Sequence, residues 1–297
     1  MKLNKNPKGS VLIMTLLITA LLVAILVEFA YGVFVKTNVL YNFRDGQNLS
    51  LIAQSGIELA NGYIKDYLAS NQYTAYASYV IPVAKITDNS NESLVVSISD
   101  ENSKFNLNTI INENGSTNDK ALSTFKRLLT ALKLDENISL YVTNWINSTA
   151  GSSSAVLTSA TTHNYLYCVD ELLSIPQISP DIYKKLAPYV TVNGDGLINI
   201  NTASEEVLMA LGENISQTTA KKIIEYREKT SPFKTTTSIQ SVSAMADKSI
   251  GIMGKITVKS TTFSVTSVAA LRGIQREIHS VTQYSGTPEQ VKYWKEF

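Results

Sequence analysis

Residues 1–36 decide the fold of this chain and read MKLNKNPKGSVLIMTLLITALLVAILVEFAYGVFVK. Three lysines precede Gly9, whereas residues 10–27 contain no charged side chain. Eighteen helical residues at about 1.5 Å each extend about 27 Å, close to the ~30 Å hydrocarbon core of a bilayer. This segment is therefore predicted to span a membrane. Because basic residues stay on the cytoplasmic side, the chain after Lys36 is expected across the membrane, in a periplasm-like space.

Three interpretations of this N-terminal segment compete. A cleaved secretory signal has a shorter apolar region of about 7–15 residues and a small-residue cleavage site, which residues 29–32 match poorly. A plain uncleaved anchor is the simplest alternative. In the third interpretation, a peptidase cuts between Gly9 and Ser10, so that the apolar segment becomes the new N-terminus. We favour the third because residues 8–13, Lys-Gly-Ser-Val-Leu-Ile, resemble the cleavage junction of type IV pilins and type II secretion pseudopilins.

Met14 departs from the pattern of these families. Pilin-like subunits usually have glutamate as the fifth mature residue, and the fifth residue counted from Ser10 is Met14. In the family, that glutamate is thought to pair with the terminal amine of a neighbouring subunit, where an unpaired buried charge would be costly. The resemblance therefore implies that this chain does not join a filament as an ordinary repeating subunit.

The composition is that of a globular protein with a balanced charge. The chain has 297 residues, 44% of them hydrophobic, which is enough for two domains. Its formal net charge is +1 and becomes −2 without the three leader lysines. Such a charge does not favour nucleic acid or anionic lipid as a partner. Cys168 is the single cysteine, so an intrachain disulfide is excluded and a buried free thiol is expected.

Both ends of the chain carry the pattern of one domain. Apolar residues at steps of three and four after the span predict a buried helical face continuous with it: Leu49, Ile52, Ala53, Gly56, Ala60, Tyr63 and Tyr67. Residues 79–86, 92–99, 104–107, 255–258, 262–269 and 275–283 have the composition of β-strands. A long helix lying on an antiparallel sheet is therefore expected.

The middle of the chain is predicted to be helical. Short helical patterns, several with a capping Ser, Thr, Asp or Pro near the start, occupy residues 120–132, 141–145, 169–174, 180–186, 204–211 and 217–228. Residues 148–164, rich in Ser, Thr and Ala, are expected to form a mobile loop. The resulting fold class is α+β, with a large helical domain inserted between strands.

An internal repeat marks this insert. The sequence Phe-Asn-Leu-Asn-Thr at residues 105–109 recurs as Ile-Asn-Ile-Asn-Thr at residues 198–202, which implies two copies of a small helical unit. The residues shared by the two copies are Asn106, Asn108, Thr109, Asn199, Asn201 and Thr202. The asparagines are expected to hydrogen-bond their own backbone and to cap the next helical turn, a structural role that we favour over ligand binding.

The order of motifs along the chain resembles general secretion pathway protein K of type II secretion. The matching motifs are Asn-Leu-Asn-Thr, Trp145-Ile146, residues 170–175 and 178–180, Asn-Ile-Asn-Thr-Ala with Val207-Leu208, and Tyr293-Trp294. This resemblance implies a pilin-like fold with a helical domain of the helix-hairpin-helix or SAM type between its strands. It implies a minor pseudopilin at the tip of the pseudopilus, a single-pass inner-membrane protein with its C-terminal domain in the periplasm. The implied partners are the I- and J-type minor pseudopilins, the major pseudopilin, prepilin peptidase, the inner-membrane assembly platform and inner-membrane lipid.

The expected domain organisation rests on these patterns. Residues 1–9 form a prepilin leader and residues 10–35 the transmembrane helix. Residues 36–103 hold the rest of the helix and the first strands, and residues 104–254 form the insert. Residues 255–297 return as the C-terminal strands of the pilin-like domain.

Two alternatives come from other classes of function. Residues 199–233 also resemble a helix-hairpin-helix unit of the kind found in DNA-binding competence proteins. Residues 104–254 contain 13 Lys and Arg against 14 Asp and Glu, and the hairpin turn has one glycine, so nucleic acid is not expected as a partner. A minor pilin of a related type IV pilus system remains the other alternative.

No cofactor, metal or catalytic residue is predicted. Some family members bind calcium in the loop after the Trp-Ile pair, but residues 138–168 contain no Asp or Glu, so that site is not carried over. His163 and Cys168 could be considered a nucleophile pair, yet their spacing shows no geometry and a structural cysteine is favoured. His279 has no motif around it. The chain is therefore expected not to be an enzyme.

Overall fold

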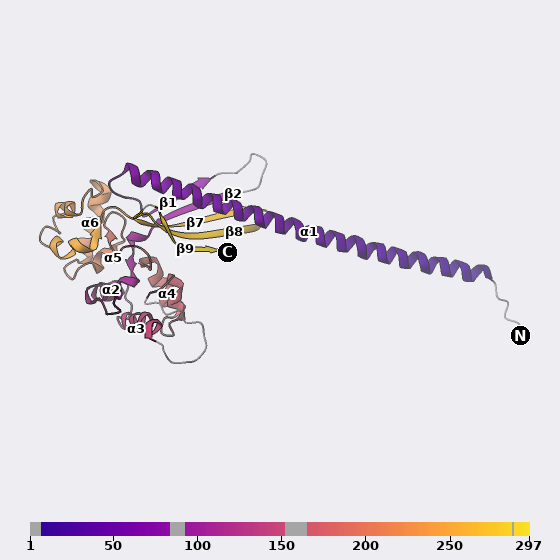
Figure 1. Ribbon diagram of the computed structural model, residues 1–297, viewed down its shortest axis with the longest axis horizontal. Helices are drawn as coiled ribbons and strands as arrows, with labels where there is room; N and C mark the ends of the chain where they lie inside the picture. The colour runs from indigo at the N-terminus through magenta and orange to yellow at the C-terminus, as the bar shows by residue number, and fades with distance from the viewer. Residues whose placement is uncertain (1–6, 84–92, 152–164, 287) are drawn as a thin grey trace.

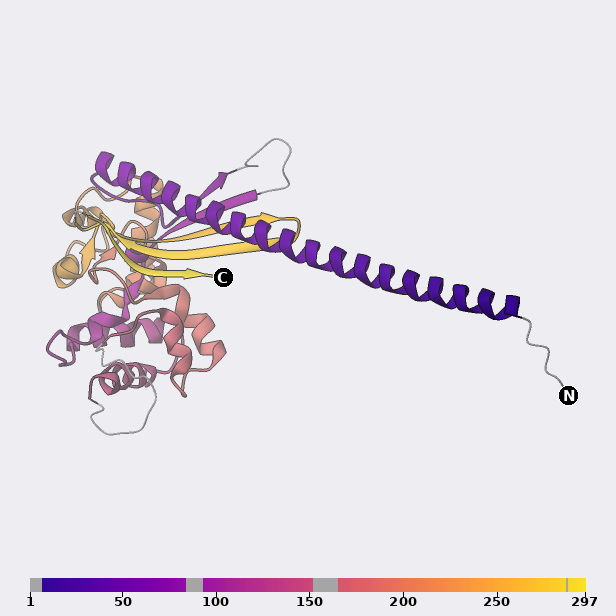
Figure 2. The same cartoon turned by 45° about the vertical axis from the view of Figure 1, so that its right-hand side comes forward.

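The computed structural model describes residues 7–83, 93–151, 165–286 and 288–297. A single helix of 64 residues, α1 (Pro7–Ser70), dominates the molecule. Its first half projects away from the rest of the chain, and its second half lies across an antiparallel sheet (Figure 1). The helical insert packs beyond one end of this sheet (Figure 2). The predicted α+β class and pilin-like arrangement are confirmed.

The elements are arranged along the chain in an order that places strands on both sides of the insert. After α1 the sheet begins with β1 (Ser78–Val83) and β2 (Ser93–Asp100). The insert contains η1 (Glu101–Ser103), β3 (Phe105–Asn106), η2 (Leu107–Ile110), α2 (Asp119–Ala131), α3 (Ile138–Gly151), η3 (Val169–Ser174), α4 (Pro180–Leu186), η4 (Ala187–Tyr189), β4 (Val190–Thr191), β5 (Ile198–Asn199), α5 (Glu205–Ala210), α6 (Gln217–Lys229), η5 (Thr236–Ser241), η6 (Ser249–Lys255) and β6 (Ile256–Thr257). The sheet then resumes with β7 (Thr262–Leu271), β8 (Ile274–Gln283) and β9 (Gln290–Glu296).

The sheet order is β1-β2-β7-β8-β9, with every neighbouring pair antiparallel. The end of β2 and the start of β7 are paired, Asp100 with Phe263. The chain therefore leaves the sheet and returns to it at one place, which lets a large domain be inserted without breaking the sheet. That place lies near the C-terminal end of α1, because Tyr67 and Asp100 line one small cavity.

The contact between α1 and the sheet has its own hydrophobic core. Small and aliphatic residues of α1, among them Ala53, Ile57 and Ile64, pack on Val96 and Val265 of the sheet. The predicted face was wrong at one end: Tyr63 is 41% exposed, whereas Ile57 and Ile64 are buried. In a helix with 3.6 residues per turn, residues seven positions apart lie on nearly the same face. The contact of α1 with the sheet therefore follows Ile57 and Ile64, and Tyr63 lies at its border.

The insert has a second, separate core and two short parallel pairings. β3 pairs with β4, and β5 pairs with β6. Residues 255–258 were expected in the pilin-like sheet, but β6 pairs with β5 inside the insert, because residues 198–199 offer it a buried parallel partner. The strand expected at residues 104–107 is limited to β3, since the asparagine turn after it bends the chain into η2.

The helical predictions for the insert agree with α2, α4, α5 and α6 within a few residues. Residues 169–174 form a 3₁₀ helix, and the pattern at 141–145 is the middle of the longer α3. α3 runs into the expected loop as far as Gly151, and residues 152–164 lie outside the described part of the chain. β9 was missed because it is an edge strand: its residues are mostly exposed and two of them are lysines, which weakens the alternation of apolar residues.

Candidate assembly helix and domain junction

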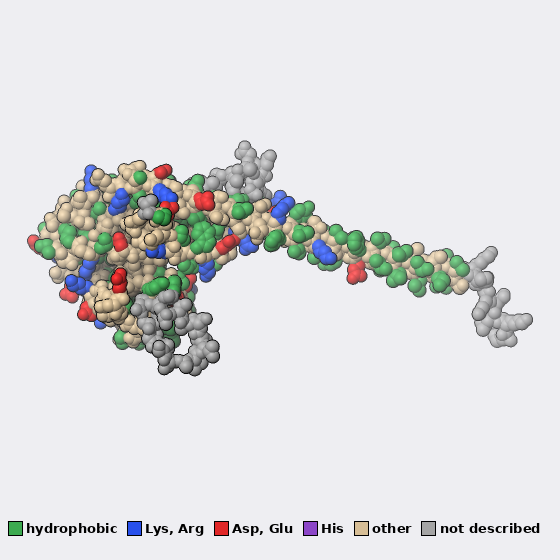
Figure 3. Space-filling model, viewed as in Figure 1, with side chains coloured by type: hydrophobic (Ala, Val, Ile, Leu, Met, Phe, Trp, Pro, Cys, Tyr) green, Lys and Arg blue, Asp and Glu red, His purple; other side chains and the backbone are tan. Residues whose placement is uncertain are grey.

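The projecting half of α1 is an apolar surface without protein cover. Large side chains along it are mostly exposed: Leu12 is 67% exposed and Phe29 is 70% exposed. Figure 3 shows hydrophobic side chains along the whole projecting part, interrupted by few charges. Residues 10–43 contain two charged side chains, Glu28 and Lys36. Such a surface is stable only when lipid or other apolar helices cover it.

The apolar surface is longer than a membrane is thick. Residues 10–28 are long enough to cross a hydrocarbon core of ~30 Å, and the exposed apolar surface continues beyond them from Phe29 onward. This outer part still exposes Phe29, Tyr31, Val33, Phe34, Val35, Val39, Leu40, Tyr41 and Phe43. It extends for about 22 Å of helix. A bilayer that covers residues 10–28 would leave this part open to contact with other apolar helices.

The residues of the predicted cleavage site and of the missing glutamate lie at the start of α1. Gly9 and Ser10 belong to its first turns, and the helix continues without interruption to Ser70. Met14 is 67% exposed on the same apolar surface. A methionine there adds to the surface without introducing a charge that would need a partner.

The two copies of the asparagine motif form the same turn. In each copy the side-chain oxygen of the first asparagine accepts a hydrogen bond from the backbone N–H of the second: Asn106 from Asn108 at 2.9 Å, and Asn199 from Asn201 at 2.9 Å. Each turn comes directly after a two-residue strand that pairs in parallel with a distant strand. The two copies of the motif therefore share one backbone conformation.

The second asparagine of each motif clamps a distant loop. The side-chain oxygen of Asn108 accepts from the backbone N–H of Leu166 at 2.7 Å, and its nitrogen donates to the carbonyl of Leu166 at 2.8 Å. Asn201 does the same with Phe233, at 2.7 and 2.9 Å. All donors and acceptors of these amides therefore go to protein backbone, which suits a structural role rather than a ligand site.

The threonines that end the motifs have different partners. Thr109 donates to the carbonyl of Asn106 at 2.6 Å, within its own turn. Thr202 donates to the carboxylate of Asp100 at 2.5 Å, so the second motif reaches into the pilin-like sheet. One motif is internal to the insert, and the other holds the insert to the rest of the protein.

Asp100 is the centre of this junction. Its carboxylate is 1% exposed and accepts from the hydroxyl of Ser260 at 2.6 Å and from the backbone of Asn102 at 2.8 Å. The Asn199 amide donates to Asp100 at 3.3 Å and also to the hydroxyl of Thr74 at 2.6 Å. Burial raises the pKa of Asp100 to about 6, although the hydrogen bonds from Ser260, Thr202 and Asn102 oppose the rise.

This junction makes the stability of the protein depend on pH. The folded state holds the Asp100 proton more tightly than the unfolded chain, because the pKa rises from 3.8 to about 6. The protonated Asp100 carboxyl therefore contributes its full share to the free energy of unfolding below pH 3.8, and this share is lost as the pH rises through about 6. Relative to Asp100→Asn, the free energy of unfolding of the wild type should fall by up to about 3 kcal/mol over this interval. Denaturant titrations from pH 3.5 to 7.5 measure this change in the free energy of unfolding. The control is Asp66→Asn, on an exposed part of α1, whose free energy of unfolding should follow the same pH dependence as that of the wild type.

Glu101 forms a second tie across the same junction. It accepts from Lys104 at 2.7 Å, from Ser264 of β7 at 2.8 Å and from Thr191 of β4. Burial raises the pKa of Glu101, but the charge of Lys104 and these hydrogen bonds outweigh burial and hold its pKa below the ordinary value. Neighbouring acids in the sequence thus have opposite pKa shifts, because only Glu101 has a cation beside it.

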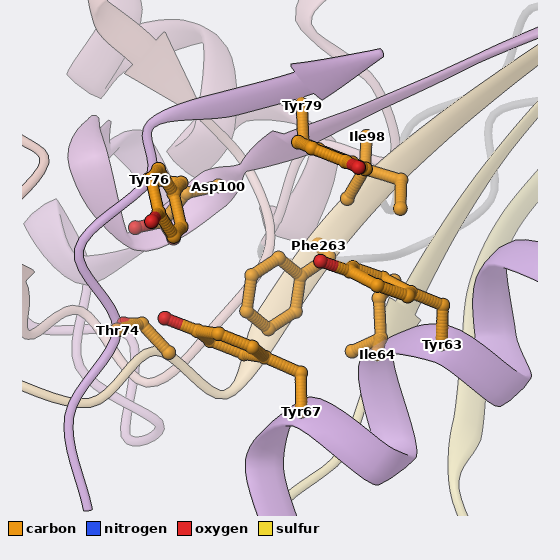
Figure 4. Close-up of a pocket in the computed structure, with 9 residues that line it drawn as sticks. All are labelled: Tyr63, Ile64, Tyr67, Thr74, Tyr76, Tyr79, Ile98, Asp100 and Phe263. Carbon is orange, nitrogen blue, oxygen red and sulfur yellow. The ribbon is translucent and has the colours of Figure 1, made fainter. Parts of the chain in front are cut away.

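Aromatic residues cover the solvent side of the junction, a feature that the sequence patterns did not predict. The rings of Tyr63 and Tyr79 stack at 5.3 Å, and Figure 4 shows them facing each other from α1 and β1, with Phe263 beside Tyr63. Tyr67 and Tyr76 continue the cluster toward Asp100. The cavity among these residues is about 30 Å³, the volume of about one water molecule. The cluster therefore shields the junction.

The structure brings two of the residues weighed as catalytic, Cys168 and His279, to the lining of one cavity of about 230 Å³. Burial raises the pKa of the Cys168 thiol, which disfavours the thiolate that a nucleophile needs. Burial lowers the pKa of His279, which favours neutral imidazole. His163 lies outside the described residues. In the described parts of the chain, no group of three or more His, Cys, Asp or Glu is placed to hold a metal ion.

These features define a class of protein: a pilin-like subunit with an apolar assembly helix and a helical domain inserted in its sheet. Two family models match the chain, both described as type II secretion system (T2SS), protein K, one over residues 103–195 and the other over residues 198–259. Together they cover more than half of the chain. The chain belongs to the protein K family of the type II secretion system.

A solved structure has the same fold. A chain of the crystal structure of the GspK-GspI-GspJ complex from the enterotoxigenic Escherichia coli type 2 secretion system matches with a TM-score of 0.65 and 15% sequence identity. The match covers 88% of this chain and 99% of that chain. A search of the curated proteins finds no match.

Proposed function

We propose that this chain is the minor pseudopilin at the tip of the type II secretion pseudopilus, where it initiates or caps the filament during protein export across the outer membrane. The position of the insert carries this proposal. The insert joins the sheet at Asp100, beside the C-terminal end of α1 and opposite its membrane-anchoring end (Figure 1). A subunit with this bulk on its membrane-distal end leaves no space for another subunit stacked above it. It works through assembly rather than catalysis.

The partners of the chain are proposed from its uncovered helix. The solved relative is a complex of GspK with GspI and GspJ, and we propose I- and J-type subunits as the helices that cover residues 29–43 here. The other proposed partners are the major pseudopilin, below the I- and J-type subunits in the filament, and the inner-membrane assembly platform. The chain is a single-pass inner-membrane protein, with its sheet and insert in the periplasm.

Site-specific photo-crosslinking tests the proposal. A photoreactive residue at Phe43, which is 67% exposed beyond the membrane, should cross-link to I- or J-type subunits in cells with an assembled system. The same residue placed at the exposed Lys133 of the insert should not, because that end of the molecule faces away from the filament. Cross-links from Lys133 to the major pseudopilin, with none from Phe43, would contradict the proposed orientation.

Processing by prepilin peptidase gives a further prediction. Glycine is favoured at the cleaved position because a peptidase site shaped for no side chain excludes larger residues. Gly9→Leu should leave residues 1–9 attached, and mass spectrometry of the mature terminus should then find Met1 in place of Ser10. Ser10→Ala, which keeps the glycine, serves as the control and should still be cut. Wild-type protein that begins at Met1 in cells with active peptidase would instead indicate a plain anchor.

The geometry of the hairpin between α5 and α6 opposes the DNA-binding alternative. In a DNA-binding hairpin, the glycine turn lets backbone N–H groups approach phosphate. Here a Cβ placed on Gly212 would lie 3.3 Å from Ile252, so η6 packs on this turn. Lys248 also donates to Thr219, in the first turn of α6, at 3.4 Å. The turn is therefore packed against the core of the insert instead of being open to phosphate. This packing favours the assembly role over DNA binding.

A further inference from the structure

A cavity of about 260 Å³ lies in the insert. It opens beside the first turn of α2 and is closed by segments distant in the sequence. Lys120 and Thr124 come from α2, and Lys255 comes from the end of η6. Its apolar wall consists of Phe105, Ala121, Ile198 and Leu211.

The cavity gathers positive charge. Lys255 donates to the carbonyl of Leu211 at 3.1 Å and to the hydroxyl of Thr124 at 3.3 Å. Arg127, behind the cavity, donates to the same hydroxyl at 3.1 Å. Burial lowers the pKa of Lys255, and the charges of Arg127 and Lys120 lower it further. Lys255 and Arg127 thus both donate to one neutral hydroxyl, and Lys120 lines the same cavity, in a domain that carries a slight excess of acids.

Among the described residues, no acid forms an ion pair with Lys120 or Lys255, although Asp119 precedes Lys120 and the charge of Glu213 acts on Lys255. Asp195, which lines the cavity, accepts from the amide of Asn102 at 2.9 Å and from the backbone of Leu197 at 3.0 Å, so its carboxylate serves the surrounding loop. Glu213 lies 3.8 Å from Arg127, but its side chain is 86% exposed and solvent screens the pair. An anion from another molecule would therefore meet two lysines that have no ion pair within the described part of the chain.

We propose that this cavity binds an acidic side chain of a partner polypeptide. The lysines would hold its carboxylate through charge-assisted hydrogen bonds. The volume is several times that of a bare oxyanion, and the apolar wall offers contact to the carbons that carry the acid and to the next residue. Duplex DNA fits less well, since the net charge of the insert is −1 and a duplex needs cations spread along a surface. This inference does not depend on the position of the chain in the filament.

The test uses the full chain in detergent micelles and a fluorescent hexapeptide that alternates glutamate with alanine. Fluorescence anisotropy should show saturable binding, about tenfold weaker for the matched glutamine peptide, because charge-assisted hydrogen bonds are lost. Lys120→Met and Lys255→Met should each weaken binding about tenfold as well. Lys126→Met is the matched control: Lys126 is exposed on α2, about 240° around the helix from Lys120, and should leave the affinity unchanged.

The outcomes separate the proposal from its alternatives. Lys255 bonds the end of α5, so Lys255→Met alone could act through folding, whereas Lys120 is exposed and its replacement leaves the fold intact. Equal affinity for the glutamate and glutamine peptides, or equal affinity of Lys120→Met and Lys126→Met, would overturn the proposal. Inorganic phosphate or a duplex that binds more tightly than the peptide, with the same dependence on Lys120, would also overturn it in favour of a phosphate site.

Discussion

Gly56→Leu is expected to separate α1 from the sheet. A Cβ at this position would lie 2.3 Å from the hydroxyl oxygen of Ser267, 3.0 Å from Val96 and 3.2 Å from Leu94. The contact between α1 and the sheet therefore has no space even for a Cβ atom, and the leucine side chain has three further carbon atoms. The free energy of unfolding should fall by about 3 kcal/mol, the upper end of the usual cost of overpacking. Denaturant titration of the full chain in detergent measures this loss.

Gly62 provides the matched control on the same helix. It is exposed, and a Cβ there would meet no atom within 4 Å. Gly62→Leu should therefore stabilise α1 by about 0.5–1 kcal/mol, because leucine has a higher helix propensity than glycine. Both variants change helix propensity equally, so the difference between them isolates the contact with the sheet. Equal stability of the two would mean that α1 does not pack on the sheet as described.

The sequence predicted those features that depend on local pattern. The uncharged run of residues 10–27 and the spacing of Leu49, Ala53 and Ala60 are enough to predict one long helix with one buried face. Capping residues such as Ser179 and Ser216 mark the starts of α4 and α6 within a residue. The Asn motifs also show their turn in the sequence, because each bonds two residues along the chain.

The missed features depend on residues that are far apart in the chain. The amide of Asn199 reaches the carboxylate of Asp100 across 99 positions, and the cavity brings Lys120 beside Lys255. Nothing local distinguishes Asp100 from an exposed aspartate. The tyrosine cluster is partly visible in the sequence, since Tyr63 and Tyr67 are one helical turn apart. Only the packing of β1 beside α1 shows that these rings cover the junction rather than the core.

The insert, rather than Met14, should determine where the protein enters the filament. If the lattice lets each subunit's glutamate pair with a neighbour's amine, a subunit with Met14 forfeits that pair, and this loss is tolerable where it occurs once. Met14→Glu alone should change assembly little, because the insert still prevents stacking above it. Replacing residues 101–262 by an Asn-Gly turn keeps the paired ends of β2 and β7, since Asp100 lies opposite Phe263 and two residues suffice for a hairpin.

The shortened chain that also carries Met14→Glu should join the filament along its whole length. The pilin-like part retains its own core between α1 and the sheet, so the deletion removes the steric block without removing the assembly surface. Immunogold labelling should find this variant on filament shafts, and the wild type and Met14→Glu at one end. The shortened chain with Met14 unchanged separates the two effects: it should join shafts less often, because each copy would leave a neighbouring amine unpaired. Wild-type protein found at intervals along the shafts would show that the insert does not block stacking, and the tip position would have to be abandoned.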